Sequence, residues 1–239
     1  MSSQSRVVVI GGGIAGCSSA LALAGRGVSV TLLEASSRLG GRYCSVDIGG
    51  IERPIDGTQN VFFRNFDRFL QLLATCEARE SVKLQNSTLL AFLEVEQRRI
   101  SKIKSGTLPP PNHLSASFLN ANFLGIGDKI SMQKAVQAMQ NTDEEQRREL
   151  DELSFLEWLE NNGQTKRAIS RFWNPISKLA LNVDCSQASA ASAIFLFKKA
   201  LIGNADALDF GCFTNDFTNA VSSSLRRTLA ASGVDVFLS

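Results

Sequence analysis

The chain has 239 residues, of which 44% are hydrophobic and 20% charged, and its formal net charge at pH 7 is +2. This composition is typical of a globular protein and excludes disordered and collagen-like chains. Lysine and arginine are interspersed with aspartate and glutamate, so no basic patch indicates a nucleic-acid partner.

The first predicted elements are a strand over residues 7–10, a helix over residues 14–24 and a second strand over residues 28–34. A basic residue, an apolar run and a cysteine at position 17 would also fit an export signal that ends at a lipid-attachment cysteine. A cleaved signal gives no reason for a following strand that ends on an acid. We therefore predict a βαβ unit, in which Cys17 is a small packing residue on the helix.

The glycines of this unit match the G-x-G-x-x-G spacing of dinucleotide-binding turns. Such glycines allow a tight turn, the approach of a pyrophosphate to the backbone, and close packing of helix on strand. The start of the helix then binds phosphates, and the acid that ends the second strand binds ribose hydroxyls. A carboxylate at that place disfavours NADP, whose 2′-phosphate it would repel. The predicted cofactor-binding residues here are Gly11, Gly13, Ala15, Gly16, Glu34 and Ala35.

The letters "EASSRLGGR" at residues 34–42 distinguish FAD from NAD. They resemble the N-terminal fingerprint of the flavoproteins that include amine oxidases, protoporphyrinogen oxidase and phytoene desaturases. This resemblance implies that FAD is the cofactor and that Gly41 and Arg42 lie along it. A guanidinium, with its fixed fork of donors, suits phosphate and ribose oxygens.

Residues 54–73 resemble, within that group, hydroxysqualene dehydroxylase, a squalene-pathway relative of the phytoene desaturases. The resemblance implies that the backbone of Gly57 and Thr58 passes the flavin ring. That family typically has Asp-Asn-Gly-Gln-His here, whereas residues 56–60 of this chain read Asp-Gly-Thr-Gln-Asn. A role that needs an imidazole is therefore in doubt at Asn60.

Further along the chain, apolar periodicity predicts an amphipathic helix over residues 64–76, with Phe66, Phe69, Leu70 and Leu73 on one face. Alternating apolar residues over 88–106, with a polar turn near Gln97, predict a β-hairpin. A helical run is expected from residue 128 onward, and Ser154 with Glu157 forms a capping box for a short helix that Gly163 ends.

The proline-led segment of residues 108–130 carries many large apolar side chains for a connection. Two interpretations stay open for residues 108–124: they pack against the core, or they contact membrane lipid or an isoprenoid substrate. Residues 171–197 again resemble the dehydroxylase family, and we expect Phe172, Trp173 and Phe195 to be core or pocket wall. A helix over residues 221–233 and a strand over 234–239 close the chain.

These elements predict an α/β fold: a Rossmann-like FAD/NAD(P)-binding domain of three-layer (ββα) type with an inserted, largely helical α+β substrate domain, truncated at the C-terminus relative to the resembled family. The expected boundaries are residues 1–65 for the FAD-binding βαβ unit with its flavin-side loop, 66–215 for the substrate domain and 216–239 for a helix and strand that return to the FAD domain. Apolar faces that the family's second half covers are then expected to be exposed.

The widely spaced five cysteines and the single histidine, His113, indicate neither a disulfide framework nor a metal site, and we expect reduced, mostly buried thiols. No apolar run reaches the roughly 20 residues of a membrane span. The expected location is the cytoplasm, with peripheral contact at the inner face of the membrane as an open alternative. No catalytic acid, base or nucleophile can be named.

The predicted function is that of an FAD-dependent oxidoreductase, or its N-terminal part, acting on a long apolar isoprenoid and resembling hydroxysqualene dehydroxylase. The alternatives are a flavoenzyme of the phytoene-desaturase or amine-oxidase type, and a nucleotide-binding fragment without activity of its own. Activity would require the missing C-terminal half, which a partner chain could supply.

Overall fold

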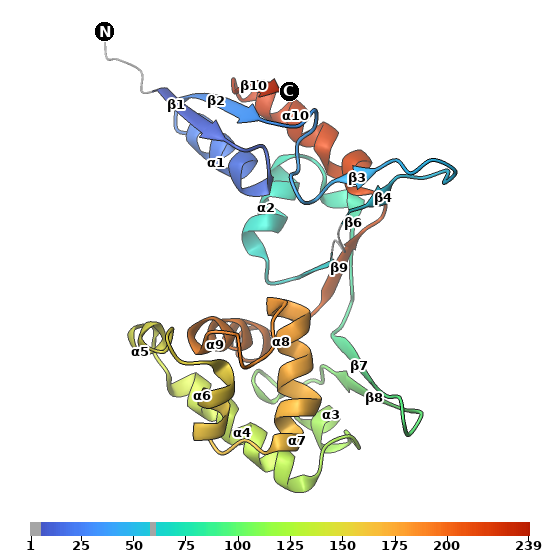
Figure 1. Ribbon diagram of the computed structural model, residues 1–239, viewed down its shortest axis with the longest axis vertical. Coiled ribbons are helices and arrows are strands. Elements are labelled where there is room, and N and C mark those ends of the chain that lie inside the picture. Colours follow the sequence, from blue (N-terminus) through green and yellow to red (C-terminus); the bar gives the residue numbers. More distant parts are fainter. Residues whose placement is uncertain (1–5, 58–60) are drawn as a thin grey trace. The chain divides into compact units, whose positions relative to one another are not determined.

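The computed structural model describes residues 6–57 and 61–239. The chain forms two compact units (Figure 1). The first unit contains the described residues up to Gln85 together with Phe210–Ser239, and the second unit contains Asn86–Asp209.

The first unit contains a parallel sheet with the strand order β1-β2-β10. Its strands are β1 (Arg6–Ile10), β2 (Ser29–Glu34) and β10 (Asp235–Leu238). Helices α1 (Ile14–Ala24) and α10 (Ser223–Ala231) pack with this sheet. The predicted strand-helix-strand opening and the closing helix and strand are therefore confirmed. Cys17, fully buried on α1, is the packing residue expected there, and its Sγ–H donates to the Gly12 carbonyl oxygen at 3.3 Å.

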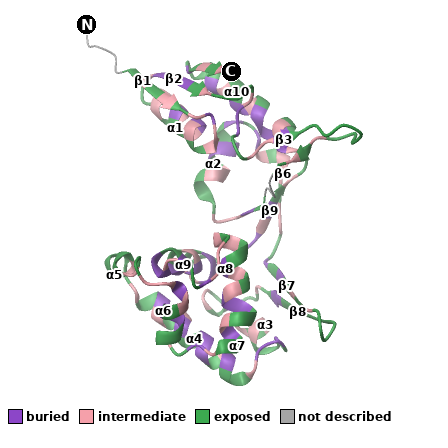
Figure 2. Cartoon of the chain, in the orientation of Figure 1, coloured by how far each residue is buried: buried purple, intermediate pink, exposed green. Residues whose placement is uncertain are grey.

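One face of this sheet remains apolar and exposed. In the parallel register Ile10 pairs with Leu33, which pairs with Phe237, so the three side chains form a row across the sheet. The exposed fractions of Ile10, Leu33 and Phe237 are 85%, 39% and 60%. Figure 2 colours parts of these strands as exposed. Parallel sheets are normally covered on both faces, and this apolar row agrees with the expectation that such a face is exposed.

The rest of the first unit contains helix α2 (Asp67–Thr75) and two small antiparallel sheets, one of β3 and β4 and one in the order β5-β9-β6. Their strands are β3 (Ser45–Val46), β4 (Ile55–Asp56), β5 (Val61–Phe63), β6 (Val82–Leu84) and β9 (Phe210–Phe213). Helix α2 begins three residues later than expected, and Phe66, which directly precedes it, is 41% exposed.

The unit boundaries differ from the expected positions at residues 65/66 and 215/216. Leu72 and Leu73 of α2 belong to the core that contains Leu32 of the parallel sheet. Strands β6 and β9 pair with each other. For this reason residues 66–85 and 210–215 pack with the first unit.

The second unit is mainly helical, with the predicted hairpin as its sheet. The elements are β7 (Leu89–Glu94), β8 (Arg99–Lys104), α3 (Ser115–Leu119), α4 (Ile126–Asn141), α5 (Glu144–Glu149), α6 (Phe155–Asn161), α7 (Lys166–Ala168), α8 (Asn174–Leu181) and α9 (Ala190–Phe197). Short π-helical turns cover Ile169–Trp173, Lys198–Gly203 and, in the first unit, Thr218–Ser222.

An aromatic cluster forms the core of the second unit. The Trp173 ring lies 6.1 Å from Phe155 and 5.0 Å from Phe197 between centroids, both in edge-to-face geometry. The indole N–H of Trp173 donates to the Gln164 side-chain oxygen at 2.9 Å, which satisfies the polar end of a buried ring. Phe172 is also buried, whereas Phe195 is 49% exposed, so the expectation of a core or pocket position is wrong for Phe195. Helix α9 turns its opposite face, with Phe197, into the core.

Candidate functional site

The glycine-rich turn connects β1 to α1 in a geometry that brings bare backbone to the start of the helix. Gly11 has a φ of +103°, which favours glycine, and its N–H donates to the Leu33 carbonyl at 2.7 Å. Gly13 is the N-cap of α1 and makes no side-chain capping bond. A helix start without a capping side chain offers backbone N–H groups and a partial positive charge to an anion.

Gly16 allows α1 to lie directly against this turn. A Cβ atom added to Gly16 would overlap the Gly11 carbonyl oxygen. This contact is with backbone and not with the flexible end of a side chain, so even alanine requires the helix to shift. The third glycine of the motif therefore has the packing role that its spacing predicts.

Glu34 lies at the end of β2 and reaches back to the glycine-rich turn. Its Oε2 accepts the Gly12 N–H at 2.5 Å, and its Oε1 accepts the Ser36 N–H at 2.8 Å. These two backbone donors, that of Gly12 first, hold the pKa of the Glu34 carboxyl below its usual value. A carboxylate has about four acceptor sites, more than these two bonds occupy.

A second glycine segment meets the first one backbone to backbone. The Gly40 N–H donates to the Gly12 carbonyl at 2.9 Å. A Cβ atom on Gly41, whose φ is +60°, would lie 3.1 Å from the Cα atom of Gly13. The Gly-Gly pair therefore lies against the start of α1.

The start of the C-terminal helical segment supports this second glycine segment. The Phe217 ring lies so close to Gly40 that an added Cβ would be 2.7 Å from its Cε1 atom. The Ser222 hydroxyl donates to the Leu39 carbonyl at 3.1 Å. Asp56 holds the same helix start, because its Oδ1 accepts the Phe217 N–H at 2.9 Å and the Ser45 hydroxyl at 2.8 Å.

The structure brings together most of the residues predicted from the motif. Those that form the glycine-rich turn and its surroundings are Gly11, Gly13, Gly16, Glu34 and Gly41. Ala15, in the first turn of α1, and Ala35, directly after Glu34, are exposed beside them, and Arg42 is exposed next to Gly41. Gly57 instead belongs to the β3–β4 hairpin, where its N–H donates to the Cys44 carbonyl at 2.7 Å. Thr58, like Asn60, lies outside the described residues.

Two further glycines belong to this site although their roles were not predicted. A Cβ atom on Gly12 would lie 2.6 Å from Leu39 Cδ2 and 2.9 Å from Glu34 Cβ. Gly40 has a φ of +120° and is enclosed by Phe217. The runs of three and two glycines in the sequence are the signals that could have indicated them.

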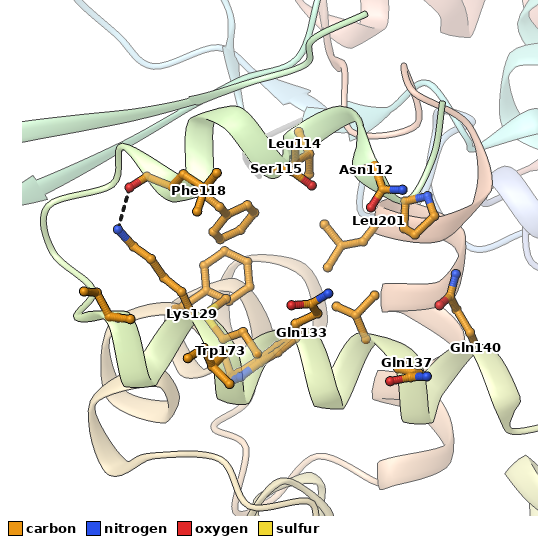
Figure 3. A pocket seen from close by; sticks show the side chains of 17 residues that line it. Asn112, Leu114, Ser115, Phe118, Lys129, Gln133, Gln137, Gln140, Trp173 and Leu201 are labelled. Carbon is orange, nitrogen blue, oxygen red and sulfur yellow. Dashed lines mark hydrogen bonds between the residues drawn. The ribbon is translucent and has the colours of Figure 1, made fainter. Parts of the chain in front are cut away.

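The second unit contains a cavity of about 780 Å³ between α3 and α4 (Figure 3). Buried Phe172, Trp173 and Leu201 line it together with the apolar segment that precedes α4. Within that segment Leu114, Phe123 and Leu124 are buried, as the core-packing interpretation predicts, whereas Leu119 is 71% exposed. Burial therefore supports the core-packing interpretation for these three side chains and not for Leu119.

Within the described ranges, no group of three or more metal-ligating side chains is gathered in a metal-binding arrangement. The same ranges contain no helix that is long and apolar enough to cross a membrane.

Comparison with known proteins identifies a family. The model of the family of flavin-containing amine oxidoreductases matches residues 14–236. A zeta-carotene desaturase of Solanum lycopersicum is 29% identical over 202 residues, which cover 80% of this chain and 34% of the relative. The chain therefore spans about a third of that relative's length.

Among solved structures, an oxidoreductase from Methanosarcina mazei matches with a TM-score of 0.68 at 15% identity. The match covers 98% of this chain and 51% of the oxidoreductase chain. A putrescine oxidase bound to putrescine matches with a TM-score of 0.63 at 20% identity. This match covers 98% of this chain and 50% of the putrescine oxidase chain. At these identities the likeness shows the fold, which is the α/β flavoprotein fold predicted from the sequence.

Proposed function

This chain belongs to the family of flavin-containing amine oxidoreductases, and on that premise we propose that it binds FAD and takes part in an oxidoreductase acting on a long apolar isoprenoid. The observation that carries the proposal is the meeting of three features at one place: the uncapped start of α1, the glycine pair at residues 40–41 and the Glu34 carboxylate.

The residues present fit the adenosine diphosphate end of FAD. Gly16 and Gly41 each occupy a place that a Cβ atom would crowd, so the backbone is kept bare and close around the start of α1. Backbone N–H groups at that start would hold the pyrophosphate, and Arg42, the residue after Gly41, would add charge. The Glu34 carboxylate would accept bonds from ribose hydroxyls.

The chemistry that bound FAD supplies is hydride transfer. The protein's part is to bind and orient the reactants and to exclude water. In this chain the glycine segments at residues 11–16 and 40–41 (the glycine cradle) and Glu34 would hold the adenosine end. The cavity of the second unit, lined by apolar side chains and several amides, would take the isoprenoid. The zeta-carotene desaturase relative supports an apolar isoprenoid substrate.

A visible-absorption titration of the purified chain with FAD tests cofactor binding. We expect saturable binding that Gly16→Ala abolishes, because the added methyl group displaces α1 from the turn. Gly49→Ala is the matched control, since a Cβ atom there meets open space. If the wild-type chain shows neither flavin absorbance nor a binding isotherm, the proposal that this chain binds FAD by itself is wrong.

The finer proposal is reductive removal of a hydroxyl from a squalene precursor, supported by the resemblance of residues 54–73 and 171–197 to hydroxysqualene dehydroxylase. A desaturase reaction is the second candidate, favoured by the zeta-carotene desaturase relative. The two reactions run in opposite redox directions. Under anaerobic conditions a desaturation substrate would bleach the oxidised flavin band, whereas a hydroxylated squalene precursor would restore that band from reduced flavin. If neither substrate changes the spectrum of a chain that does bind FAD, the alternative of a nucleotide-binding fragment without activity is favoured.

A further inference from the structure

We propose that the cavity between α3 and α4 binds one elongated, uncharged isoprenoid chain that carries a neutral hydrogen-bonding group, such as a hydroxyl, at one end. This deepens the proposed function and rests on it for the isoprenoid class. The length, polarity and charge of the occupant follow from the cavity itself.

The cavity is long because it follows one helix. Its lining residues on α4 run from Ile126 to Gln140, which at 1.5 Å per residue is about 20 Å along the helix axis. Its volume of about 780 Å³ lies within the ~300–1,000 Å³ range of small-molecule sites. A compact diamine would leave most of this length unfilled.

The two ends of the cavity differ in character. Where α4 begins, Leu119, Ile126 and Ile130 line the cavity with exposed fractions of 71%, 79% and 54%. At the other end Asn112, Gln137 and Gln140 present side-chain amides (Figure 3). Amides both donate and accept hydrogen bonds and therefore suit a hydroxyl group.

The charge of the described lining favours a neutral ligand. Among the described residues that line the cavity, Lys129 carries the charge, and its Nζ donates to the Leu119 carbonyl at 2.7 Å, at the apolar end (Figure 3). The described lining offers no carboxylate to pair with an amine and no arginine or lysine at the amide end to pair with a diphosphate.

Intrinsic fluorescence can report occupancy directly. The chain has two tryptophans, of which Trp173 lines the cavity and Trp158 does not. In a Trp158→Phe background, titration with geranylgeraniol is expected to change Trp173 emission saturably with one site. Dodecylamine and geranylgeranyl diphosphate are expected to bind at least tenfold more weakly. Isothermal titration calorimetry on the wild-type chain provides the same comparison, so the conclusion does not depend on how well the Trp158→Phe variant folds.

Two variants distinguish a bound chain from unspecific partition. Val136→Phe places a ring in the cavity and is expected to weaken geranylgeraniol binding at least tenfold, whereas Lys134→Phe, exposed on the same helix outside the lining, is the matched control. Replacing Gln137 and Gln140 together by leucine should reduce the preference for the alcohol over its parent hydrocarbon about three- to tenfold, the share of a lost hydrogen bond. Gln187→Leu, exposed and outside the lining, is the control for that change.

Equal affinity for amine and alcohol, unsaturable binding, or equal behaviour of the two phenylalanine variants would each overturn the inference. The titrations are made without FAD. A chain that binds geranylgeraniol but not FAD would contradict the cofactor proposal alone, and a chain that binds FAD but not geranylgeraniol would contradict the cavity assignment alone.

Discussion

Glu34 carries the most specific residue-scale prediction, because its carboxylate contacts the glycine-rich turn and is the group that we propose binds the ribose. Glu34→Ala is expected to weaken binding of ADP, which has only the adenosine diphosphate end of FAD, by about 1–3 kcal/mol, the cost of unpaired hydroxyls. Isothermal titration calorimetry with ADP measures this change. Glu96→Ala in the second unit is the control, and an unchanged ADP affinity would mean that Glu34 does not bind the ribose.

The backbone bonds to Glu34 also predict a pH dependence of stability. Because the pKa of its carboxyl is lowered in the folded chain, the charged form stabilises the fold at pH values above the ordinary value of 4.5. This contribution is lost as the pH falls below 4.5 through the lowered pKa. Urea unfolding of wild type and Glu34→Gln should differ most near neutral pH and converge in acid. A constant difference would contradict the assignment.

His113 predicts a second loss of stability in acid, although here it is the neutral form that the fold favours. It is buried, its Nδ1 has no hydrogen-bond partner within the described part of the chain, and burial lowers the pKa of its imidazole below 6.5. The unfolded chain then takes up a proton before the folded chain does, so stability is full above pH 6.5 and falls as the pH drops below it. His113→Phe, which cannot titrate, should flatten the dependence of the urea midpoint on pH just below 6.5. If the slope is the same in both proteins, other groups cause it.

At the scale of elements, Asp56 joins the β3–β4 hairpin to the start of the C-terminal helical segment. Asp56→Ala leaves the Phe217 N–H and the Ser45 hydroxyl without this acceptor, at an expected cost of about 1–3 kcal/mol in the free energy of unfolding. Asp56→Asn should cost less, because an amide oxygen can still accept both bonds. Denaturant unfolding of the two variants compares them, and equal losses would show that charge, not acceptance, matters.

Local sequence patterns predicted those helices and strands that residues close together in the sequence determine. Glycine spacing and apolar periodicity indicated β1, α1 and β2, and the alternation over residues 88–106 indicated the β7–β8 hairpin. The capping box of Ser154 and Glu157 is confirmed at the start of α6. Periodicity could not decide which apolar side chains the tertiary packing covers. Phe66, assigned to the apolar face of a helix, and Phe195, assigned to core or pocket wall, are both exposed.

The candidate site was predictable only where one stretch of chain contains it. The contacts of Gly40 with Gly12 and of Phe217 with Gly40 join residues that are far apart in sequence. No motif spacing encodes such contacts. The glycine runs mark Gly12 and Gly40, but the residues that they meet, and the role of Asp56, appear only in the folded chain. The cavity has the same origin, since its lining comes from segments between Pro111 and Leu201.

At the scale of the whole molecule, the two units have separate cores and carry separate candidate sites. The glycine cradle lies within the first unit and the cavity within the second. The boundaries predicted at residues 65/66 and 215/216 differ from those of the two units, because β9 pairs with β5 and β6 from more than a hundred residues away. A strand of four residues carries too little periodicity to reveal such a partner.

The exposed row of Ile10, Leu33 and Phe237 has a consequence for the solubility of this protein at high salt. Sulfate is excluded from protein surfaces and strengthens the burial of apolar groups, so ammonium sulfate should drive copies of the chain together through this face. We expect light scattering to rise at a lower salt concentration for the wild type than for an Ile10→Thr, Phe237→Thr variant, with little difference in melting temperature because both side chains are exposed. Identical salting-out curves would contradict this. Salting-out therefore becomes a simple assay for any molecule that covers the sheet, because covering the row removes the surface on which the copies meet.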